Sequence, residues 1–179
     1  IRNFQDSYYV LAMKVFRGVP QHLKKFDCAV AIGNFDGVHR GHQALLQEVV
    51  SAAKDRGLMP CAVTFEPHPK EVFPHGQEVL PRVNNLRDKV IDDRLARMSP
   101  RQFCEEILVE GLHARWVTVG EDFHFGYKGQ GTVKDLKALG KELGFEVWVT
   151  PTLFHGNERI SSTRLRQALA QDDLFEITQ

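Results

Sequence analysis

The chain has 179 residues, enough for one substantial hydrophobic core, and its 23 basic and 23 acidic residues balance, so no overall field favours nucleic acid or an acidic membrane surface. Its three cysteines lie far apart in sequence and form no CxxC pair, which argues against a disulfide framework and against a thiolate metal site. No apolar run approaches the ~18 residues that cross a bilayer. Together, these features lead us to expect a single soluble domain in the cytoplasm, with no nucleic-acid or membrane partner.

The first predicted strand and helix lie in the N-terminal third of the chain. Residues 1–12 show no clear period and precede Met13, so we set them apart as an N-terminal arm or a non-native remnant. The apolar run CAVAI (28–32), bounded by turn residues, predicts a strand covered on both faces. After a glycine-rich stretch, apolar residues recur at helical spacing and predict a helix with one buried face. These residues are Leu45, Leu46, Val49, Val50 and Ala53.

A second strand and a capped helix follow. CAVTF (61–65) predicts another buried strand, which the two prolines of EPHP (66–69) end because they lack backbone N–H groups. Ser99 before Pro100, with Gln102 at the third helical position, is the pattern of a capping box. It predicts a helix whose buried residues are Phe103, Ile107 and Leu108.

The C-terminal half repeats the alternation of strand and helix. RWVTV (115–119) predicts a strand, and EVWVT (146–150) predicts another that ends at Pro151. Between them, Thr132 with Asp135 predicts a second capped helix. The apolar positions are Leu136, Leu139 and Leu143 in this helix, and Leu165, Ala168 and Leu169 in a last helix that we expect to begin near Ser162.

Strands that alternate with helices predict an α/β fold, a parallel sheet with helices on both faces, because parallel strands need crossover connections. In such folds, ligands bind outside the carboxyl ends of the strands. Three of the predicted strands run at that end into segments rich in glycine, histidine or proline. These segments are GNFDGVHRGH (33–42), EPHPK (66–70) and GEDFHFG (120–126).

The glycine-rich segment after the first strand has the features of an anion site. Gly33 and Gly37 let the chain turn sharply and bring its backbone close to a ligand, and Gly41 leaves the first turn of the helix without a Cβ atom. The helix then presents unpaired N–H groups and the positive end of its dipole to the same space. An anion such as a phosphate group fits there.

Two histidines stand at the start of this helix. His39 and His42 are three residues apart and can point the same way, so two imidazole N–H donors can converge on one phosphate group. Donors already in place suit a phosphoryl group whose negative charge grows during attack by another phosphate. Two other interpretations stay open: a plain turn whose histidine caps its own helix, and a zinc site completed by His68 or His75, although no known catalytic carboxylate–histidine motif accompanies it.

These residues carry a resemblance to a known family. HRGH (39–42) resembles the HxGH signature of the adenylyl- and cytidylyltransferase superfamily, and the longer IGNFDGVHRGHQ (32–43) resembles the flavin adenylyltransferase module of bacterial bifunctional riboflavin kinase/FMN adenylyltransferases, the prokaryotic FAD synthetases. Three further segments agree with that family in the same order. They are TFEPHPKEVF (64–73), VGEDFHFG (119–126) and RISSTRLR (159–166).

The resemblance implies a Rossmann-like nucleotidyltransferase fold over residues 13–179 and an enzyme in which the phosphate of FMN attacks the α-phosphorus of ATP in line, giving FAD and pyrophosphate, with Mg²⁺ bound to the ATP. The implied catalytic residues are His39, His42, Arg159, Ser162 and Thr163. The implied ATP-binding residues are Gly33, Asn34, Phe35, Asp36, Gly37, His39, Gly41, His42, Ile160, Ser161, Ser162, Thr163 and Arg166. The implied FMN-binding residues are Pro67, His68, Asp122, Phe123, Phe125 and Arg159.

The residues of the later segments also have plainer interpretations. The hydroxyls and arginines of ISSTRLR (160–166) suit a polyphosphate, or they form an ordinary helix N-cap and a solvated face. Phe123 and Phe125 alternate and can line an apolar wall, and EPHPK can be a simple exit from a strand. Many family members carry asparagine where Asp122 stands, although aspartate still accepts a hydrogen bond.

Two features depart from the family pattern. Between the matches to LRDKV (86–90) and RLARMSP (94–100), relatives usually carry a helix continuation and a strand, whereas this chain has only IDD. Either this is a deletion that costs the sheet a strand, or the sequence joins two segments that flank an omitted one. The family's riboflavin kinase domain is absent after Gln179, and we expect it in the parent protein.

Two alternative functions follow from the same residues. The first is another HxGH nucleotidyltransferase that acts on nicotinate mononucleotide, phosphopantetheine or glycerol phosphate. The second is a non-catalytic module that binds flavin or nucleotide.

Overall fold

The computed structural model describes residues 18, 26–35, 38–65, 93–152, 154–155 and 158–159. The predicted last helix near Ser162, the arm over residues 1–12 and the 90–91 junction lie outside these residues. No helix within the described part of the chain is both long and apolar enough to cross a membrane.

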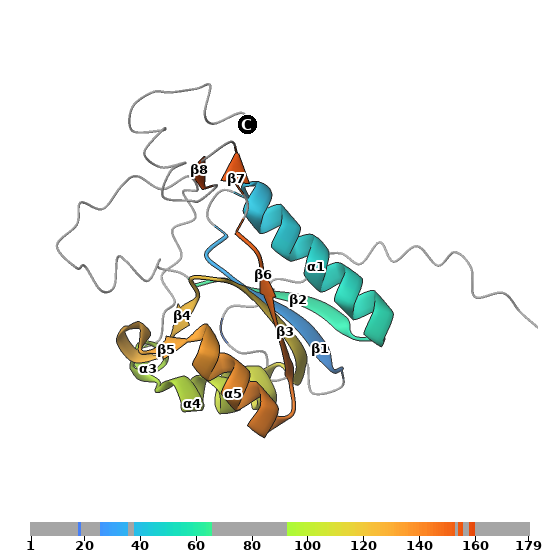
Figure 1. Cartoon of the computed structure of the whole chain (residues 1–179). Coiled ribbons are helices and arrows are strands. Elements are labelled where there is room, and N and C mark those ends of the chain that lie inside the picture. The colour runs from blue at the N-terminus through green and yellow to red at the C-terminus, as the bar shows by residue number, and fades with distance from the viewer. Residues whose placement is uncertain are drawn as a thin grey trace, which may run out of the picture.

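A four-stranded parallel sheet forms the centre of the described molecule (Figure 1). Its strands, in spatial order, are β2 (Met59–Val63), β1 (Cys28–Ile32), β3 (Ala114–Gly120) and β6 (Glu146–Thr150). Every neighbouring pair runs parallel. The α/β fold with a parallel sheet is therefore confirmed, and the carboxyl ends of β1, β2 and β3 meet at one edge as expected.

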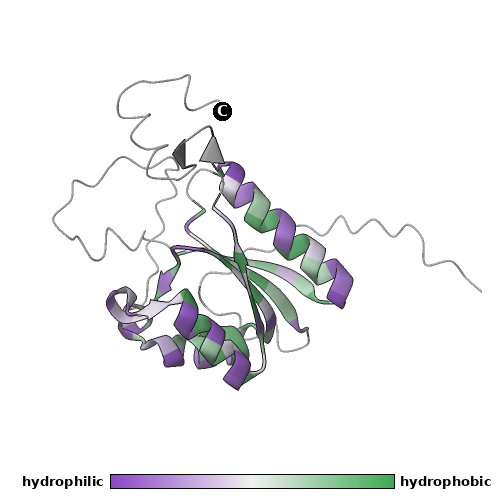
Figure 2. Ribbon diagram, in the orientation of Figure 1, coloured by the Kyte–Doolittle hydropathy of each residue, from purple (hydrophilic) through white to green (hydrophobic). Residues whose placement is uncertain are grey.

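Helices cover both faces of the sheet, because residues of β1 alternate between two hydrophobic clusters. Ala29 and Ala31 face α1 (Arg40–Arg56), where their small side chains let the helix approach closely. Cys28, Val30 and Ile32 face the opposite helices. Figure 1 shows α1 on one side of the sheet and α5 on the other, and Figure 2 shows hydrophobic residues concentrated in the strands between them.

The second face is covered by α4 (Pro100–Gln102), the helix η1 (Phe103–Gly111) that continues it, and α5 (Val133–Leu143). Both predicted capping boxes are present. Ser99 Oγ accepts the Gln102 N–H while Gln102 Oε1 accepts the Ser99 N–H, and Thr132 and Asp135 make the equivalent pair. A short helix, α3 (Asp93–Arg97), precedes them.

Three details differ from the sequence predictions. β2 begins and ends two residues earlier than expected, at Met59 and Val63, and its residues alternate between partly buried and exposed. It lies at the edge of the sheet formed by the described strands, a position at which Pro60 is tolerated within it. Val50 was expected in the buried face of α1 but is 55% exposed, because α1 contacts the sheet through Leu45 and Val49.

The third difference concerns η1, which is a π-helix and not the α-helix that its sequence predicts. The N–H of Leu112 bonds to the carbonyl of Ile107, five residues back, at 3.0 Å. The predicted buried residues Phe103, Ile107 and Leu108 nevertheless lie in the core.

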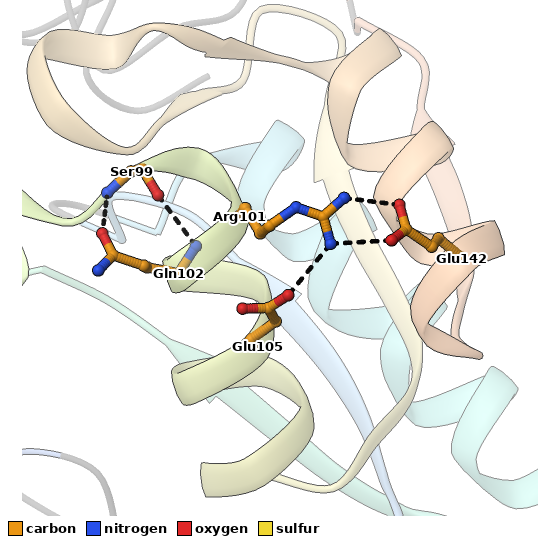
Figure 3. Close-up of polar contacts among 5 residues, drawn as sticks. All are labelled: Ser99, Arg101, Gln102, Glu105 and Glu142. Carbon is orange, nitrogen blue, oxygen red and sulfur yellow. Dashed lines mark hydrogen bonds and ion pairs between the residues drawn. The ribbon is translucent and has the colours of Figure 1, made fainter.

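Arg101 ties this helical layer together (Figure 3). Its guanidinium donates two hydrogen bonds to Glu142 of α5, at 2.9 and 2.7 Å, and one to Glu105 of η1, at 3.1 Å. The paired guanidinium holds the pKa of Glu142 below its usual range. All three side chains are substantially exposed, so we expect salt to weaken this link between α4, η1 and α5.

Two small hairpins follow β3 and β6 at the carboxyl edge of the sheet. β4 (His124–Phe125) pairs with β5 (Gly131–Thr132), with a 3₁₀ turn η2 (Tyr127–Gly129) between them. β7 (Phe154–His155) pairs with β8 (Glu158–Arg159). Figure 1 shows β7 and β8 at the end of the sheet where α1 begins.

The three cysteines are free thiols. Although distant in sequence, Cys28 of β1 and Cys61 of β2 bring their Sγ atoms to 3.4 Å, which the register of the two strands permits. Burial raises the pKa of Cys104, in η1, to about 12.

Candidate active site

The start of α1 places His39 at the N-cap position. Its backbone is extended, with φ −68° and ψ 169°, and its Nδ1 accepts the backbone N–H of His42 at 3.3 Å. The capping interpretation of this histidine is thus correct. Because Nδ1 is used as an acceptor, the neutral His39 ring carries its proton on Nε2.

The two imidazoles of the HRGH segment lie face to face. The rings of His39 and His42 are stacked with centroids 3.7 Å apart and planes 18° apart. The prediction that they point the same way is confirmed. The first turn of α1 contains no acidic residue, so the positive end of the helix dipole beside these rings is not neutralised from within the helix. This arrangement favours an anion at the start of α1.

Phe35 contacts the histidine pair, and Gly33 lies next to the Phe35 ring. The Phe35 ring meets His42 edge to face, with centroids 5.1 Å apart and planes 65° apart. Gly33 does not have the positive φ that a sharp glycine turn suggests. Instead, a Cβ atom at residue 33 would lie 3.2 Å from Cζ of Phe35, so glycine leaves room for that ring.

Asn34 lies between these two residues and has a buried side-chain oxygen. Its Oδ1 has no hydrogen-bond partner within the described part of the chain. A buried acceptor without a donor is unusual in folded proteins and is a reason to look for a ligand group beside it.

The loop after β3 carries three of the predicted flavin-site residues. Asp122 is exposed, Phe123 is partly buried, and Phe125 is 5% exposed within the core, 5.6 Å from the ring of Phe103. The rings of Phe123 and Phe125 are stacked at 5.5 Å. The apolar-wall interpretation therefore holds for both phenylalanines, since Phe123 also packs against the core cluster. Phe123 is only partly buried, and Asp122 is exposed, so both have surface at the carboxyl edge of the sheet.

A contact that the sequence did not predict joins this loop to the segment after β6. The carboxylate of Glu121 accepts the backbone N–H of Thr152 at 3.1 Å and also accepts the Thr152 hydroxyl. These residues follow neighbouring parallel strands, so a pairing across the sheet edge was in principle foreseeable from strand order. Nothing in the sequence itself singles out Glu121.

The structure describes only some of the remaining predicted site residues. Arg159 lies in β8, which follows β6 at the same edge of the sheet as the start of α1. Gly41 lies in the first turn of α1. The other predicted residues lie outside the described part of the chain, and these are Asp36, Gly37, Pro67, His68, Ile160, Ser161, Ser162, Thr163 and Arg166. His75, named in the zinc alternative, also lies outside them.

Within the described residues, no three side chains of the His, Cys, Asp or Glu type converge as metal ligands. An ion carried by a bound nucleotide needs few protein ligands, because Mg²⁺ in such sites is held largely by phosphate oxygens and water. The donor set at the start of α1 suits an anion, and the residues present are compatible with a metal that arrives with its triphosphate.

A family model and several curated proteins similar to this chain point to the same family. The family model of FAD synthetase matches the chain in two stretches, residues 21–92 and residues 90–164, which overlap at residues 90–92. Proteins named bifunctional riboflavin kinase/FMN adenylyltransferase are similar to this chain. That of Escherichia coli K12 is 37% identical, over 90% of this chain and 57% of its own length.

Further relatives agree. The protein of the same name from Haemophilus influenzae is 38% identical over 82% of this chain and 52% of its own length, and that from Pseudomonas fluorescens is 37% identical over 90% and 56%. The chain thus spans little more than half the length of these relatives. A crystal structure described as a macrolide-efflux protein from Streptococcus pneumoniae has a similar fold, with a TM-score of 0.68 and 26% identity over 87% of this chain and 57% of that one.

Proposed function

The chain belongs to the FAD synthetase family, and from this premise we propose that it transfers the adenylyl group of ATP to FMN, forming FAD and pyrophosphate. The observation that carries the proposal is the stacked pair of His39 and His42 at the start of α1. Two imidazoles and a helix N-terminus at the carboxyl edge of a parallel sheet suit a group whose negative charge grows during reaction.

The chain's own groups then act chiefly by alignment and electrostatics, since phosphoryl-type transfer offers a protein little covalent chemistry. The phosphate of FMN attacks the α-phosphorus of ATP, and the bond to the bridging oxygen of the leaving pyrophosphate breaks. His39 and His42 donate hydrogen bonds to the α-phosphoryl and bridging oxygens. No covalent intermediate on the enzyme is proposed.

The rest of the ATP site is proposed on both sides of these histidines. Next to them, Gly33, the backbone of residue Phe35 and Gly41 line the nucleotide, and the buried Oδ1 of Asn34 accepts a hydrogen bond from it. Arg159, Ser162 and Thr163 hold the leaving pyrophosphate through a guanidinium fork and hydroxyls. The other proposed ATP-binding residues are Asp36, Gly37, Ile160, Ser161 and Arg166.

For the acceptor, we assign FMN to the edge where β2 and β3 end. Asp122 and Phe123 contact the flavin, and Pro67, His68 and Arg159 complete its site. The ring of the buried Phe125 stacks on the ring of Phe123 and holds it in place. An aromatic ring with exposed surface beside an acceptor carboxylate suits a flavin, which combines a planar ring with hydrogen-bonding edges.

Mg²⁺ is proposed as the ion that accompanies ATP. It neutralises triphosphate charge and would be held mainly by the nucleotide's own oxygens. We also propose that the parent protein carries a riboflavin kinase domain, as the names of the bifunctional relatives say of them, and that it works in the cytoplasm, where its three free thiols remain reduced.

One experiment tests the proposed function directly. The protein is incubated with ATP, Mg²⁺ and one acceptor at a time (FMN, nicotinate mononucleotide, phosphopantetheine or glycerol phosphate), and the products are separated by chromatography. FAD with equimolar pyrophosphate supports the proposal. An adenylylated product formed only with another acceptor assigns the chain to a different HxGH transferase. Tight FMN binding, seen as flavin fluorescence quenching, without pyrophosphate release assigns it to a non-catalytic binding module.

A further inference from the structure

Three aromatic rings form a continuous column at the start of α1. Phe35, in the segment after β1, meets His42 edge to face with centroids 5.1 Å apart, and His42 stacks on His39 with centroids 3.7 Å apart. His42 therefore contacts both of the other rings. We call Phe35, His42 and His39 the ring column.

Both ends of the column are anchored. At one end, His39 is fixed as the N-cap, with its Nδ1 bound to the His42 N–H at 3.3 Å. At the other end, Phe35 is partly buried and packs against the hydrophobic cluster between α1 and the sheet. The middle ring is thus held by contacts that depend on the outer two.

The space for Phe35 depends on Gly33. A Cβ atom at residue 33 would lie 3.2 Å from Cζ and 3.4 Å from Cε1 of the Phe35 ring, which is tighter than ordinary contact. The backbone of Gly33 has no positive φ, so its conformation alone does not demand glycine. The ring of Phe35 supplies the reason for glycine at this residue.

We propose that Phe35 is a positioning residue for the histidine pair, and that its ring braces His42 in the orientation in which the imidazole meets the transferring phosphoryl group. The proposal rests on the proposed function, which places that phosphoryl group beside the histidines. The physical reason is that a donor must already be in place when charge develops, and small misplacements of a catalytic group cost large factors in rate. Phe35 acts through His42 and needs no contact of its ring with the substrate.

The test separates bracing from simple core packing. In Phe35→Leu, the apolar volume is largely kept but the ring is lost, so we expect kcat to fall about tenfold while KM for ATP and for FMN changes less than about twofold. Phe35→Tyr keeps the ring and is expected to retain kcat within about threefold. Leu58→Ala is the matched control, because Leu58 packs on the same cluster at the far end of α1, and it should lower Tm without lowering kcat.

A spectroscopic measurement tests the same geometry without any reaction. The ring protons of His42 are assigned in the NMR spectrum by their loss in His42→Ala. A ring 5.1 Å away shifts those signals through its ring current, so they should move in Phe35→Leu and stay in Leu58→Ala and Phe35→Tyr. If wild type makes no FAD while these shifts behave as expected, the proposed function fails and the brace stands as a structural finding.

A double-mutant cycle gives an independent check. Gly33→Ala should push the Phe35 ring and lower kcat severalfold, but should cost almost nothing further in a Phe35→Leu background, where the ring is gone. Strictly additive losses, or a Phe35→Leu variant with wild-type kcat and unmoved His42 signals, would overturn the proposal. Should Phe35→Leu not fold, Gly33→Ala and Phe35→Tyr still decide between the two outcomes.

Discussion

Glu121, at the end of β3, holds Thr152, just beyond β6, through both the backbone N–H and the hydroxyl of that threonine. One carboxylate thus joins the loop that carries Asp122 and Phe123 to the segment that leads into β7 and β8. In the proposed enzyme, these are the acceptor side and the pyrophosphate side of one site. The Glu121–Thr152 contact therefore fixes these two sides relative to each other without itself touching the substrate.

Loss of this link should weaken FMN binding. In Glu121→Ala, two hydrogen bonds to a carboxylate disappear, and we expect KM for FMN to rise about fivefold, as ~1 kcal/mol of lost order in the loop implies. Glu121→Gln keeps an acceptor oxygen and should show a smaller rise. Steady-state kinetics measure both, with Glu110→Ala, an exposed carboxylate on η1, as the control. A KM equal to that of wild type in Glu121→Ala would show that the link does not order the flavin loop.

His42 should contribute to the chemical step rather than to flavin affinity. A charge-stabilising donor contributes on the order of 3 kcal/mol, so His42→Ala should lose about a hundredfold or more in kcat with the Kd for FMN little changed. Rapid-quench assays and flavin fluorescence give the two quantities. His113→Asn is a suitable control, since His113 lies at the opposite edge of the sheet with φ 48°, a conformation that asparagine tolerates. Equal kcat in His42→Ala and wild type would remove the histidine pair from the mechanism.

His39 has a structural role and a proposed catalytic role, and two substitutions separate them. His39→Ala removes both the cap of α1 and the imidazole, so it should lose about 1 kcal/mol of unfolding free energy as well as kcat. His39→Asn restores a good N-cap but no imidazole, and it should have nearly wild-type stability with the same loss of kcat. Urea denaturation and steady-state assays are compared across the pair. If His39→Asn is fully active, His39 serves only as the cap.

Thr118 and Thr150 share a buried hydrogen bond between β3 and β6, with their Oγ1 atoms 2.9 Å apart. Thr118→Val would leave the Thr150 hydroxyl without this partner, and we expect a loss of about 1–3 kcal/mol in unfolding free energy. The double variant with Thr150→Val should lose less than the sum of the two single variants, because it leaves no unpaired hydroxyl. Additive losses in urea denaturation would mean that packing, and not the hydrogen bond, explains the cost.

The close thiol pair predicts selective cysteine chemistry. The hydrogen bond with Cys28 lowers the pKa of Cys61 below its ordinary 9.0, whereas the same contact and burial raise the pKa of Cys28. Thiolate is the reactive form, so iodoacetamide should label Cys61 first, beginning at a lower pH than an ordinary thiol requires. In Cys28→Ala, the onset should move to higher pH. Peptide mass spectrometry measures the rates, and faster labelling of the buried Cys104 would contradict this assignment.

Much of the secondary structure follows from local patterns in the sequence. The strands at 28–32 and 146–150 have the predicted bounds, and the caps formed by Ser99 and Thr132 are present as expected. These features depend on interactions among residues within a few positions of one another, which is why the sequence reveals them. The proximity of the His39 and His42 rings was predictable for the same reason, since His39 is the N-cap and His42 the third residue of one helix.

Other features required the tertiary structure. The edge position of β2 and the exposure of Val50 depend on which elements pack against them, and the π-helical form of η1 is not visible in its apolar pattern. The contacts between Cys28 and Cys61 and between Glu121 and Thr152 join residues 33 and 31 positions apart. Local sequence determines which segments form helices and strands and how the capped helices begin. Which side chains meet across strands depends on the register and order of the sheet, because those are set by packing of the whole core.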